Sequence, residues 1–389
     1  MFRKKITLIV LSLCIILMQE SKTFAWYDYC DECCCERFWF DADYLYWKIK
    51  KAPEHVPLVV EGPFVESGPV LKQPGYSVVL GGKSLKTDWR SGGRFTLGYW
   101  FDDSQCLGGE VGYFILPSKS KRHSVCSNGS PFLTLPYYDV VTGEENSSPL
   151  SSPDPTNPFA GTGRLKEHNF MQGAEVNLVT STACDCCFRY GLLAGFRYWN
   201  FTEKLTFDTN SPGIDTPDVF KTQDRFHAQN NFYGGQFGAR LDYNACNFFF
   251  NIKGKVALGA MCQKLGIHGQ FITDTLNSEL QKFNQGFFAL PTNIGNHKKT
   301  RFSVIPEVNI NLGYQVTECF RLKLGYTFIY ATNVLWAGKQ IDRKINPTQS
   351  IVLKNNSDVH LVGDPSPKAS LKSESLWVQG LNVGLEFNF

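Results

Sequence analysis

The sequence lacks a second long apolar run. Its one such run, ITLIVLSLCIILM at residues 6–18, follows MFRKK and precedes Thr23-Phe24-Ala25. A basic start, a short apolar stretch and small residues near a cleavage point are typical of a secretory signal peptide, so we predict cleavage after Ala25. The 13 residues of the run are too few to cross a bilayer as a helix. The exported chain is therefore either soluble outside the inner membrane or inserted without helices.

An excess of charge of either sign is also missing. Loss of the signal peptide removes Arg3, Lys4, Lys5, Lys22 and Glu20, which takes 39 basic and 36 acidic residues to 35 of each. A chain of near-zero net charge offers no electrostatic basis for binding nucleic acid. We therefore expect no nucleic-acid partner.

Motifs for catalysis, phosphate binding and metal binding are missing as well. No motif pairs a nucleophile with any of the seven histidines, which fall in predicted loops or at a strand end: His55, His123, His168, His227, His268, His297 and His360. The glycine-rich stretch 80–83 lacks the strand-to-helix context of a phosphate loop. The runs CDECCC and ACDCC have no second cysteine pair at regular spacing, and export favours disulfides over metal thiolates. We predict that the protein is not an enzyme and has no metal or cofactor, with zinc binding as the alternative for these thiols.

The sequence does contain a persistent period of two. In the final stretch SLWVQGLNVGLEFNF, large apolar residues alternate with polar or small ones, which is the pattern of a strand with two different faces. Lengths near ten residues suit tilted membrane strands, although a soluble sandwich strand can alternate in the same way. Ten segments show this pattern: 38–50, 94–101, 107–116, 169–179, 188–200, 232–243, 248–259, 302–314, 320–330 and 377–389.

The gaps between these segments alternate without exception between long and short. They are 51–93, 102–106, 117–168, 180–187, 201–231, 244–247, 260–301, 315–319 and 331–376. Short periplasmic turns and long external loops are typical of transmembrane barrels. We therefore predict an all-β fold, a transmembrane antiparallel up-and-down β-barrel of 10 to 14 strands over residues 38–389, with the long loops outside. A soluble sandwich is the alternative.

Three further segments and one proline are ambiguous. Segments 76–82, 204–208 and 350–354 are apolar enough to form extra strands or hairpins within the long gaps. Pro306 removes a ladder hydrogen bond from the eighth strand, which predicts a bulge there.

The cysteines concentrate at one predicted end. Segment 26–37 and the short turns together predict a periplasmic rim where an oxidising compartment can pair thiols. The members of this rim are Cys30, Cys33, Cys34, Cys35, Cys106, Cys184, Cys186, Cys187, Cys246 and Cys319, whereas Cys126 and Cys262 fall in long loops. Adjacent cysteines bridge each other poorly, so we expect links to other envelope proteins or to a second copy, with purely internal disulfides as the alternative.

Inward positions of the predicted strands carry charges of both signs. The predicted pore-lining residues are Arg94, Glu110, Glu175, Arg189, Arg197, Arg240, Lys253, Lys255, Glu307, Arg321, Lys323 and Glu386, joined by Asp41 and Asp43. This balance predicts weak ion selectivity. The alternative is that the charges pair and close a narrow barrel, since a wide channel needs about sixteen strands.

Several blocks together resemble a known family. FSVIPEVNINLGYQVTECFRLKLGYTFIYATNVLWAGKQID, NNFYGGQFGARLDY, GFRYWNF, ADYLYWK and the terminal WVQGLNVGLEFNF are similar to the pore-forming, major-outer-membrane-protein-like family of Legionella and the environmental chlamydiae. The resemblance implies an outer-membrane barrel with porin-like activity and no cofactor. The cysteine-rich turns look like those of the chlamydial branch, whose envelope proteins are tied by disulfides.

These observations predict a porin of the cell outer membrane, in contact with its lipid, for passive diffusion of small hydrophilic solutes and disulfide-linked into the envelope. The first alternative is a structural or adhesive envelope barrel with a plugged lumen and no transport. A soluble exported β-protein is the second.

Overall fold

The computed structural model describes residues 37–51, 56–64, 70–71, 73–82, 89–183, 187–275, 278–354 and 362–389. The chain divides into two units, Met1–Glu36 and Arg37–Phe389, and the barrel lies within the second. The predicted signal peptide lies outside the described residues, and so does the cysteine-rich segment 26–37 apart from Arg37.

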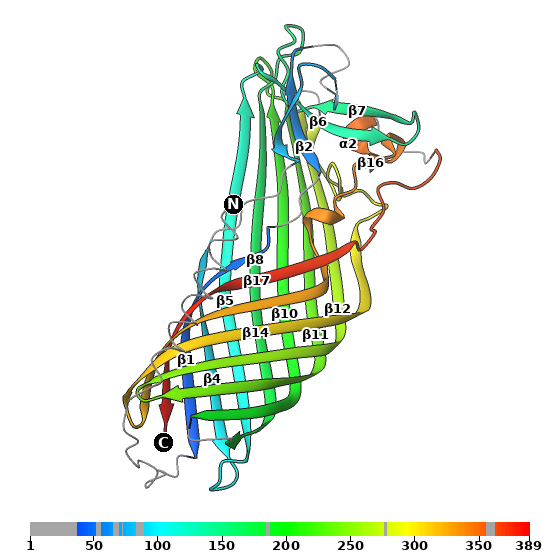
Figure 1. Ribbon diagram of the computed structural model, residues 1–389. Helices are drawn as coiled ribbons and strands as arrows, with labels where there is room; N and C mark the ends of the chain where they lie inside the picture. Colours follow the sequence, from blue (N-terminus) through cyan, green and yellow to red (C-terminus); the bar gives the residue numbers. More distant parts are fainter. Residues whose placement is uncertain are drawn as a thin grey trace. The chain divides into compact units, whose positions relative to one another are not determined.

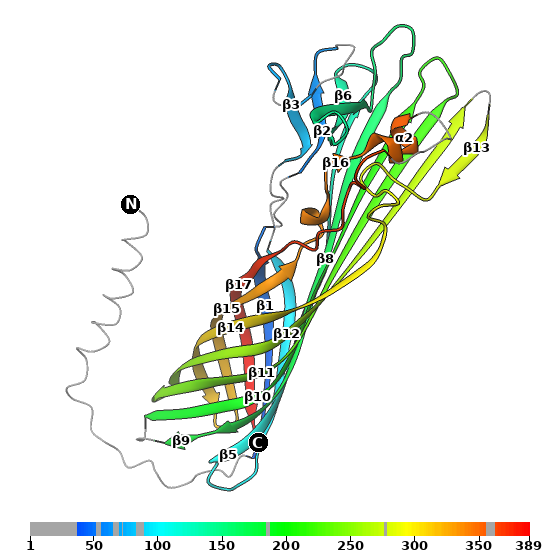
Figure 2. The same ribbon diagram turned by 90° about the vertical axis from the view of Figure 1, so that its right-hand side faces the viewer.

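Ten antiparallel strands form a closed barrel (Figures 1 and 2). Each strand pairs with the next along the chain, and the last pairs with the first through Trp39↔Asn388 to Ile49↔Val378, which closes the ring. The prediction of a β-barrel is confirmed, at the lower limit of the expected strand number. The ten strands are β1 (Phe38–Ile49), β4 (Arg90–Trp100), β5 (Leu107–Ser127), β8 (Gly161–Thr180), β10 (Phe188–Pro212), β11 (Val219–Ala245), β12 (Phe248–Thr275), β14 (Gly295–Thr317), β15 (Phe320–Leu335) and β17 (Ser373–Asn388).

The outer surface carries an apolar band between two rings of aromatic side chains. Outward leucines such as Leu97, Leu192 and Leu324 are exposed, as lipid-facing side chains of a barrel are. At one edge of the band, ring pairs include Phe188–Tyr243 at 4.7 Å and Phe248–Tyr314 at 5.2 Å between centroids. Toward the other edge lie Tyr46–Trp89 at 5.1 Å and Tyr198–Tyr233 at 5.3 Å. We call these the lower and upper girdles.

The lower girdle lies at the end of the barrel that carries the short connections. These turns join β4 to β5, β8 to β10, β11 to β12 and β14 to β15. The C-terminus lies at the same end, where the Phe389 N–H donates to the Phe38 carbonyl over 2.9 Å. We call it the turn end and its opposite the head end.

Six strands continue far beyond the upper girdle toward the head end. On β5, β8, β10, β11, β12 and β14 the alternation persists, but the outward residues become polar. The expected long gap 201–231 is therefore mostly strand, and 204–208 lies inside β10. The gaps 117–168 and 260–301 are shortened in the same way. We call these extensions the wall.

Segments from the gaps 51–93, 117–168 and 331–376 fold into a second sheet at the head end. It contains β2 (Pro57–Gly62), β3 (Ser77–Gly81), β6 (Phe132–Asp139), β7 (Glu144–Pro149) and β16 (Lys344–Ile345). The strand expected over 76–82 is thus confirmed as β3. The ambiguous segment 350–354 is instead mostly helical, as α2 (Ile351–Lys354). Small elements complete the chain: β9 (Thr182–Ala183), β13 (Ser278–Phe283), η1 (Gly338–Gln340) and η2 (Pro347–Gln349).

The bulge expected at Pro306 is wrong. The register with β12 continues unshifted through Val256↔Pro306. The ladder to β15 stops instead at Glu307↔Ile329, next to the residue that has no N–H to donate. Beyond it the Val304 N–H donates to the Thr332 hydroxyl over 2.9 Å.

Among the described residues no helix is both long and apolar enough to cross a bilayer.

Candidate functional site in the barrel interior

The barrel interior between the girdles is occupied by paired charges. Eight of the twelve predicted pore-lining residues meet there with Asp41 and Asp43, because the inward phase of each strand brings them to similar heights. We call this set the ion-pair layer. Its members are Asp41, Asp43, Arg94, Glu110, Glu175, Arg197, Lys253, Lys255, Glu307 and Lys323.

The layer is connected across the lumen. Lys255 Nζ lies 2.7 Å from Glu175 Oε1 and 3.3 Å from Glu307 Oε1. Glu307 also binds the Arg197 guanidinium, and these two side chains are only 4% and 2% exposed. Charges buried this deeply are stable only when paired and hydrogen-bonded, so removal of any member of this group leaves a buried charge without its partner.

A second group of pairs joins β1, β4 and β15. Arg94 Nη2 lies 2.7 Å from Asp43 Oδ2, and Lys323 Nζ lies 2.6 Å from Asp41 Oδ1. Lys253 Nζ lies 2.8 Å from Glu110 Oε1 on another side of the lumen. At the height of the ion-pair layer, the interior therefore matches the alternative in which the inward charges pair with each other and close a narrow barrel.

The other four predicted residues lie outside the layer, nearer the turn end. Arg321 pairs with Glu386 at 3.1 Å, and Arg240 pairs with Asp242 at 2.8 Å. Arg189 donates to the Gln105 side chain over 3.2 Å. All twelve residues thus lie on inward positions, while their role in lining a pore stays a prediction.

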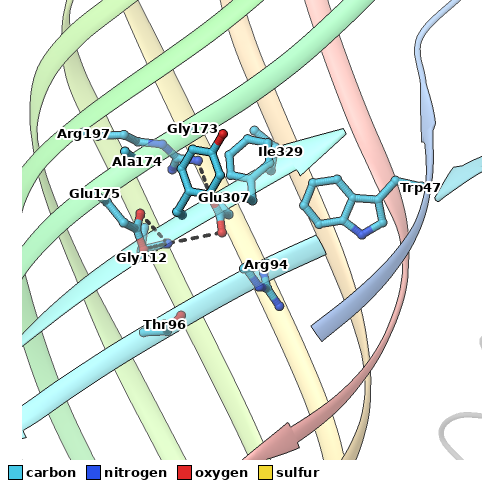
Figure 3. A pocket seen from close by; sticks show the side chains of 13 residues that line it. Trp47, Arg94, Thr96, Gly112, Gly173, Ala174, Glu175, Arg197, Glu307 and Ile329 are labelled. Carbon is cyan, nitrogen blue, oxygen red and sulfur yellow. Dashed lines mark hydrogen bonds and ion pairs between the residues drawn. The ribbon is translucent and has the colours of Figure 1, made fainter. Parts of the chain in front are cut away.

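A cavity of about 20 Å³ lies beside the layer (Figure 3). Trp47, Arg94, Glu175, Arg197, Lys255 and Glu307 line it. A volume of this size holds roughly one water molecule. The lining glycine Gly173 does not widen it, since a Cβ there would lie 2.3 Å from Phe114 Cε1. Side chains therefore fill the lumen at this height.

An apolar layer lies above the ion pairs on the head side. On β10 the inward order is Arg197, Trp199 and Phe201, so charge gives way to aromatic rings within one strand. Trp47 packs on Phe114 with ring centroids 5.7 Å apart, and its Nε1 donates to Asn382 Oδ1 over 2.7 Å. The members share near-complete burial: Leu45, Trp47, Ile49, Phe114, Leu116, Met171, Trp199, Phe201, Phe232, Ala257, Met261, Ile305, Ile329, Ala331, Val334, Trp336, Leu376 and Val378.

One member of the apolar layer comes from a connection rather than from a sheet strand. Trp336 follows β15 and packs edge-on against Phe201, with centroids 5.3 Å apart. We call residues 335–341 the strap. The Leu335 N–H donates to Asn230 Oδ1 over 2.7 Å, and Asn230 Nδ2 donates to the Leu335 carbonyl over 2.9 Å. The Ala337 N–H donates to Glu203 Oε2 over 2.6 Å.

Sequence reasoning missed Asn230, Glu203 and Trp336. Asn230 and Glu203 lie on the continued inward phase of β11 and β10, in segments that were expected to be loops. Extending the alternation past the first outward polar residue would have found them. No local signal marks Trp336, because its place in the lumen depends on partners more than 100 residues away in the sequence.

A third buried site fixes the connection that follows β13. Asp224 on β11 accepts hydrogen bonds from the N–H groups of Phe287 (3.2 Å), Phe288 (2.9 Å) and Ala289 (2.7 Å). Burial raises the pKa of Asp224 to about 6, against the opposing effect of these three donors. The two phenylalanines join the apolar core between the wall and the second sheet.

Four of the ten predicted rim cysteines can be placed. Cys106, Cys187, Cys246 and Cys319 lie in the turns of the turn end, and each is a free thiol. Cys30, Cys33, Cys34, Cys35, Cys184 and Cys186 lie outside the described residues. Cys126 and Cys262 lie on the wall strands instead. The clustering thus extends to all four rim cysteines within the described ranges, and their cross-linking stays a prediction.

One serine–histidine pair lies on the surface of the barrel. Within the described ranges no three His, Cys, Asp or Glu side chains gather as metal ligands. His168 Nδ1, however, lies 3.0 Å from Ser120 Oγ on the outer face of the wall. The sequence showed no motif for this pair because the two residues are 48 positions apart.

Several solved structures are similar to this chain at low sequence identity. The outer-membrane protease OmpT from Escherichia coli is 8% identical with a TM-score of 0.39, covering 95% of this chain and 99% of that one. A mutant of the monoaromatic hydrocarbon channel TodX is 7% identical with a TM-score of 0.22, covering 91% and 90%. The Ralstonia pickettii toluene transporter TbuX is 8% identical with a TM-score of 0.16, covering 91% and 90%.

The prediction that the protein is not an enzyme is wrong as a conclusion from the sequence. A protease stands among the solved structures similar to this chain. The structure also brings Ser120 and His168 within hydrogen-bond distance, a pairing that no sequence motif marks.

A protein family covers nearly the whole described barrel. No curated protein matches the chain. Residues 39–389 match the family described as Putative beta barrel porin-7 (BBP7), which supports a porin-like role in an outer membrane. The narrower resemblance to a Legionella or chlamydial branch stays a prediction. With ten strands closed on themselves and a match over residues 39–389, this chain belongs to the BBP7 family of β-barrel porins.

Proposed function

We propose that this protein is a porin-like outer-membrane barrel that is closed at rest and passes small hydrophilic solutes when the strap leaves the lumen. The observation that carries the proposal is the strap itself. Trp336 completes the apolar layer from a connecting segment, so one closing element can move without breaking the ring of strands. Its hydrogen bonds to the wall run to Asn230 and Glu203, and its Leu335, Ala337 and Ile341 also pack in the core between the wall and the second sheet.

Below the strap, the ion-pair layer offers a polar path that is narrow. A barrel of this strand number has an interior that side chains nearly fill, so only ions and very small solutes fit after side chains rotate. The layer holds five cations and five carboxylates, and this balance supports weak selectivity between anions and cations.

Single-channel recording in planar bilayers tests the proposal. The wild-type barrel should be mostly silent, and Trp336→Ala should open more often because the apolar layer loses a large buried ring. Trp89→Ala is the matched control, since this tryptophan is 41% exposed and stacks with Tyr46 in the upper girdle. A folded Trp336→Ala barrel that stays silent would favour the structural alternative, a permanently plugged envelope barrel.

We also propose that the head end faces outside and that the turn-end thiols link the barrel to other envelope proteins or to a second copy. Support comes from the exposed positions of Cys106, Cys246 and Cys319 on one rim. Non-reducing electrophoresis of envelopes, with thiols blocked at lysis, should show high-mass species that collapse to monomer on reduction. A band that is monomeric without reductant would leave internal disulfides only.

A further inference from the structure

The outer face of the wall is strongly basic just beyond the upper girdle. We call this surface the basic wall. Its cations are Arg122, Lys166, Lys204, Arg225, Lys264 and Lys298, with His168, His227 and His268 among them. All six lysines and arginines are exposed, and none forms an ion pair with another described residue. The only carboxylates at outward positions of the described wall strands are Asp208 and Asp274, which lie closer to the tip.

Like charges sit directly opposite each other across this sheet. Arg122 faces Lys166 between β5 and β8, and Lys264 faces Lys298 between β12 and β14. Lys204 lies between His168 and His227, one on each neighbouring strand. Directly opposed like charges destabilise a sheet, so such a pattern costs stability unless an anion lies between the side chains.

The inner face of the same strands is covered by the second sheet. Leu165, Leu205, Phe226 and Ile267 pack there in one core with the second sheet. The basic side chains therefore do not take part in packing the wall against the second sheet. They cluster on the outer surface alone.

The position of the basic wall identifies its partner. Lys298 lies just beyond the membrane edge on the head side. Phe302, four residues later on β14, is 66% exposed and belongs to the apolar band. Four strand residues span roughly 13 Å along a tilted strand, so the cations begin where lipid headgroups lie. Clusters of lysine and arginine beside a membrane recognise anionic headgroups.

We propose that the basic wall binds phosphate-bearing lipid headgroups of the leaflet next to the upper girdle. The phosphates lie between opposed cations such as Lys264 and Lys298 and remove their repulsion. Under the orientation proposed above this is the outer leaflet. The binding itself does not depend on that orientation or on transport.

The test uses the full chain folded in a neutral detergent, with phosphatidylglycerol as the probe. Native mass spectrometry and thermal unfolding are followed with phosphatidylglycerol, with phosphatidylcholine and with inorganic phosphate at matched concentration. We expect phosphatidylglycerol to be retained and to raise the Tm, and the other two to have little effect. In the variant K264Q/K298Q retention should fall on the order of ten-fold.

Two further results keep the proposal falsifiable. Without lipid, K264Q/K298Q should unfold at the same or a higher temperature than the wild type, because the repulsion is gone. The control K368Q/K372Q removes two exposed lysines from a connection and should leave retention unchanged. Equal retention by wild type and K264Q/K298Q overturns the proposal. Equal stabilisation by inorganic phosphate overturns the assignment to a lipid.

Discussion

Neighbouring residues on one barrel strand meet opposite surroundings. On β15, Leu322 and Leu324 are exposed on the outer surface, whereas Lys323 between them is 8% exposed and pairs with Asp41. The inward or outward phase predicted for this strand is therefore confirmed. It follows that the stability lost on substitution in this strand depends more on whether the position faces inward or outward than on the residue introduced.

Leu324→Arg should lower the free energy of unfolding by about 2–4 kcal/mol, because it places a charge on the lipid face near the membrane centre. Urea unfolding of the barrel in lipid vesicles measures this. Gln270→Arg, at an exposed outward position of the wall, is the control and should change stability by less than about 0.5 kcal/mol. Equal losses for both would mean that the apolar band does not mark the membrane.

On the same strand, the space beside the inward Gly325 is already filled by a neighbouring side chain. A Cβ on Gly325 would lie 2.1 Å from Asn311 Oδ1. A large side chain at Gly325 therefore disturbs packing as well as the lumen, so conductance of such a variant reports on both.

At the scale of elements, the connection after β13 depends on one carboxyl group. The pKa of Asp224 is raised from 3.8 to about 6, so the folded state binds the proton more tightly than the unfolded state. The contribution of Asp224 to stability is therefore largest below about pH 4. It declines between pH 4 and pH 6 as the unfolded state releases its proton first.

Docking of residues 286–290 should weaken across this window by about 3 kcal/mol, which corresponds to the difference between the two pKa values. Amide exchange at Phe287, Phe288 and Ala289, corrected for intrinsic rates, measures it. Asp224→Asn should remove the pH dependence at these amides and leave that of the barrel strands unchanged. A protection that rises from pH 4 to pH 6 would show that the three N–H donors outweigh burial.

At the scale of the whole molecule, the two ends of the barrel differ in construction. The turn end is a set of short connections with exposed thiols, while the head end carries the wall, the second sheet and the strap. This asymmetry implies a fixed orientation in the membrane.

Surface proteolysis of intact cells should cut the tip between β10 and β11 at 213–218, where Asp215 and Thr216 are exposed, and spare the turn-end connections near 102–105 and 246–247. Epitope tags inserted at the same two places and detected on unpermeabilised cells give an independent measurement. Labelling at 246–247 alone would invert the orientation.

The sequence by itself determined the ten strands, their order and which side chains face inward. Each of these follows from a local period of two and from the lengths of the gaps, which short windows such as 188–200 and 320–330 already contain. The pattern of large apolar outward residues underestimated the length of the wall strands. In the wall the outward residues become polar, while the inward residues keep the same alternation. The sequence predicted charges in the lumen without their partners.

Only the tertiary structure decided what closes the barrel. Arg197 and Glu307 are 110 residues apart, and Asn230 and Leu335 are 105 apart, so neither contact leaves a trace in any local pattern. The closed ring holds all ten strands in register and thereby places these distant groups at one height. The same ring aligns Lys264 with Lys298 and Arg122 with Lys166, so the basic wall exists only once the strands are paired.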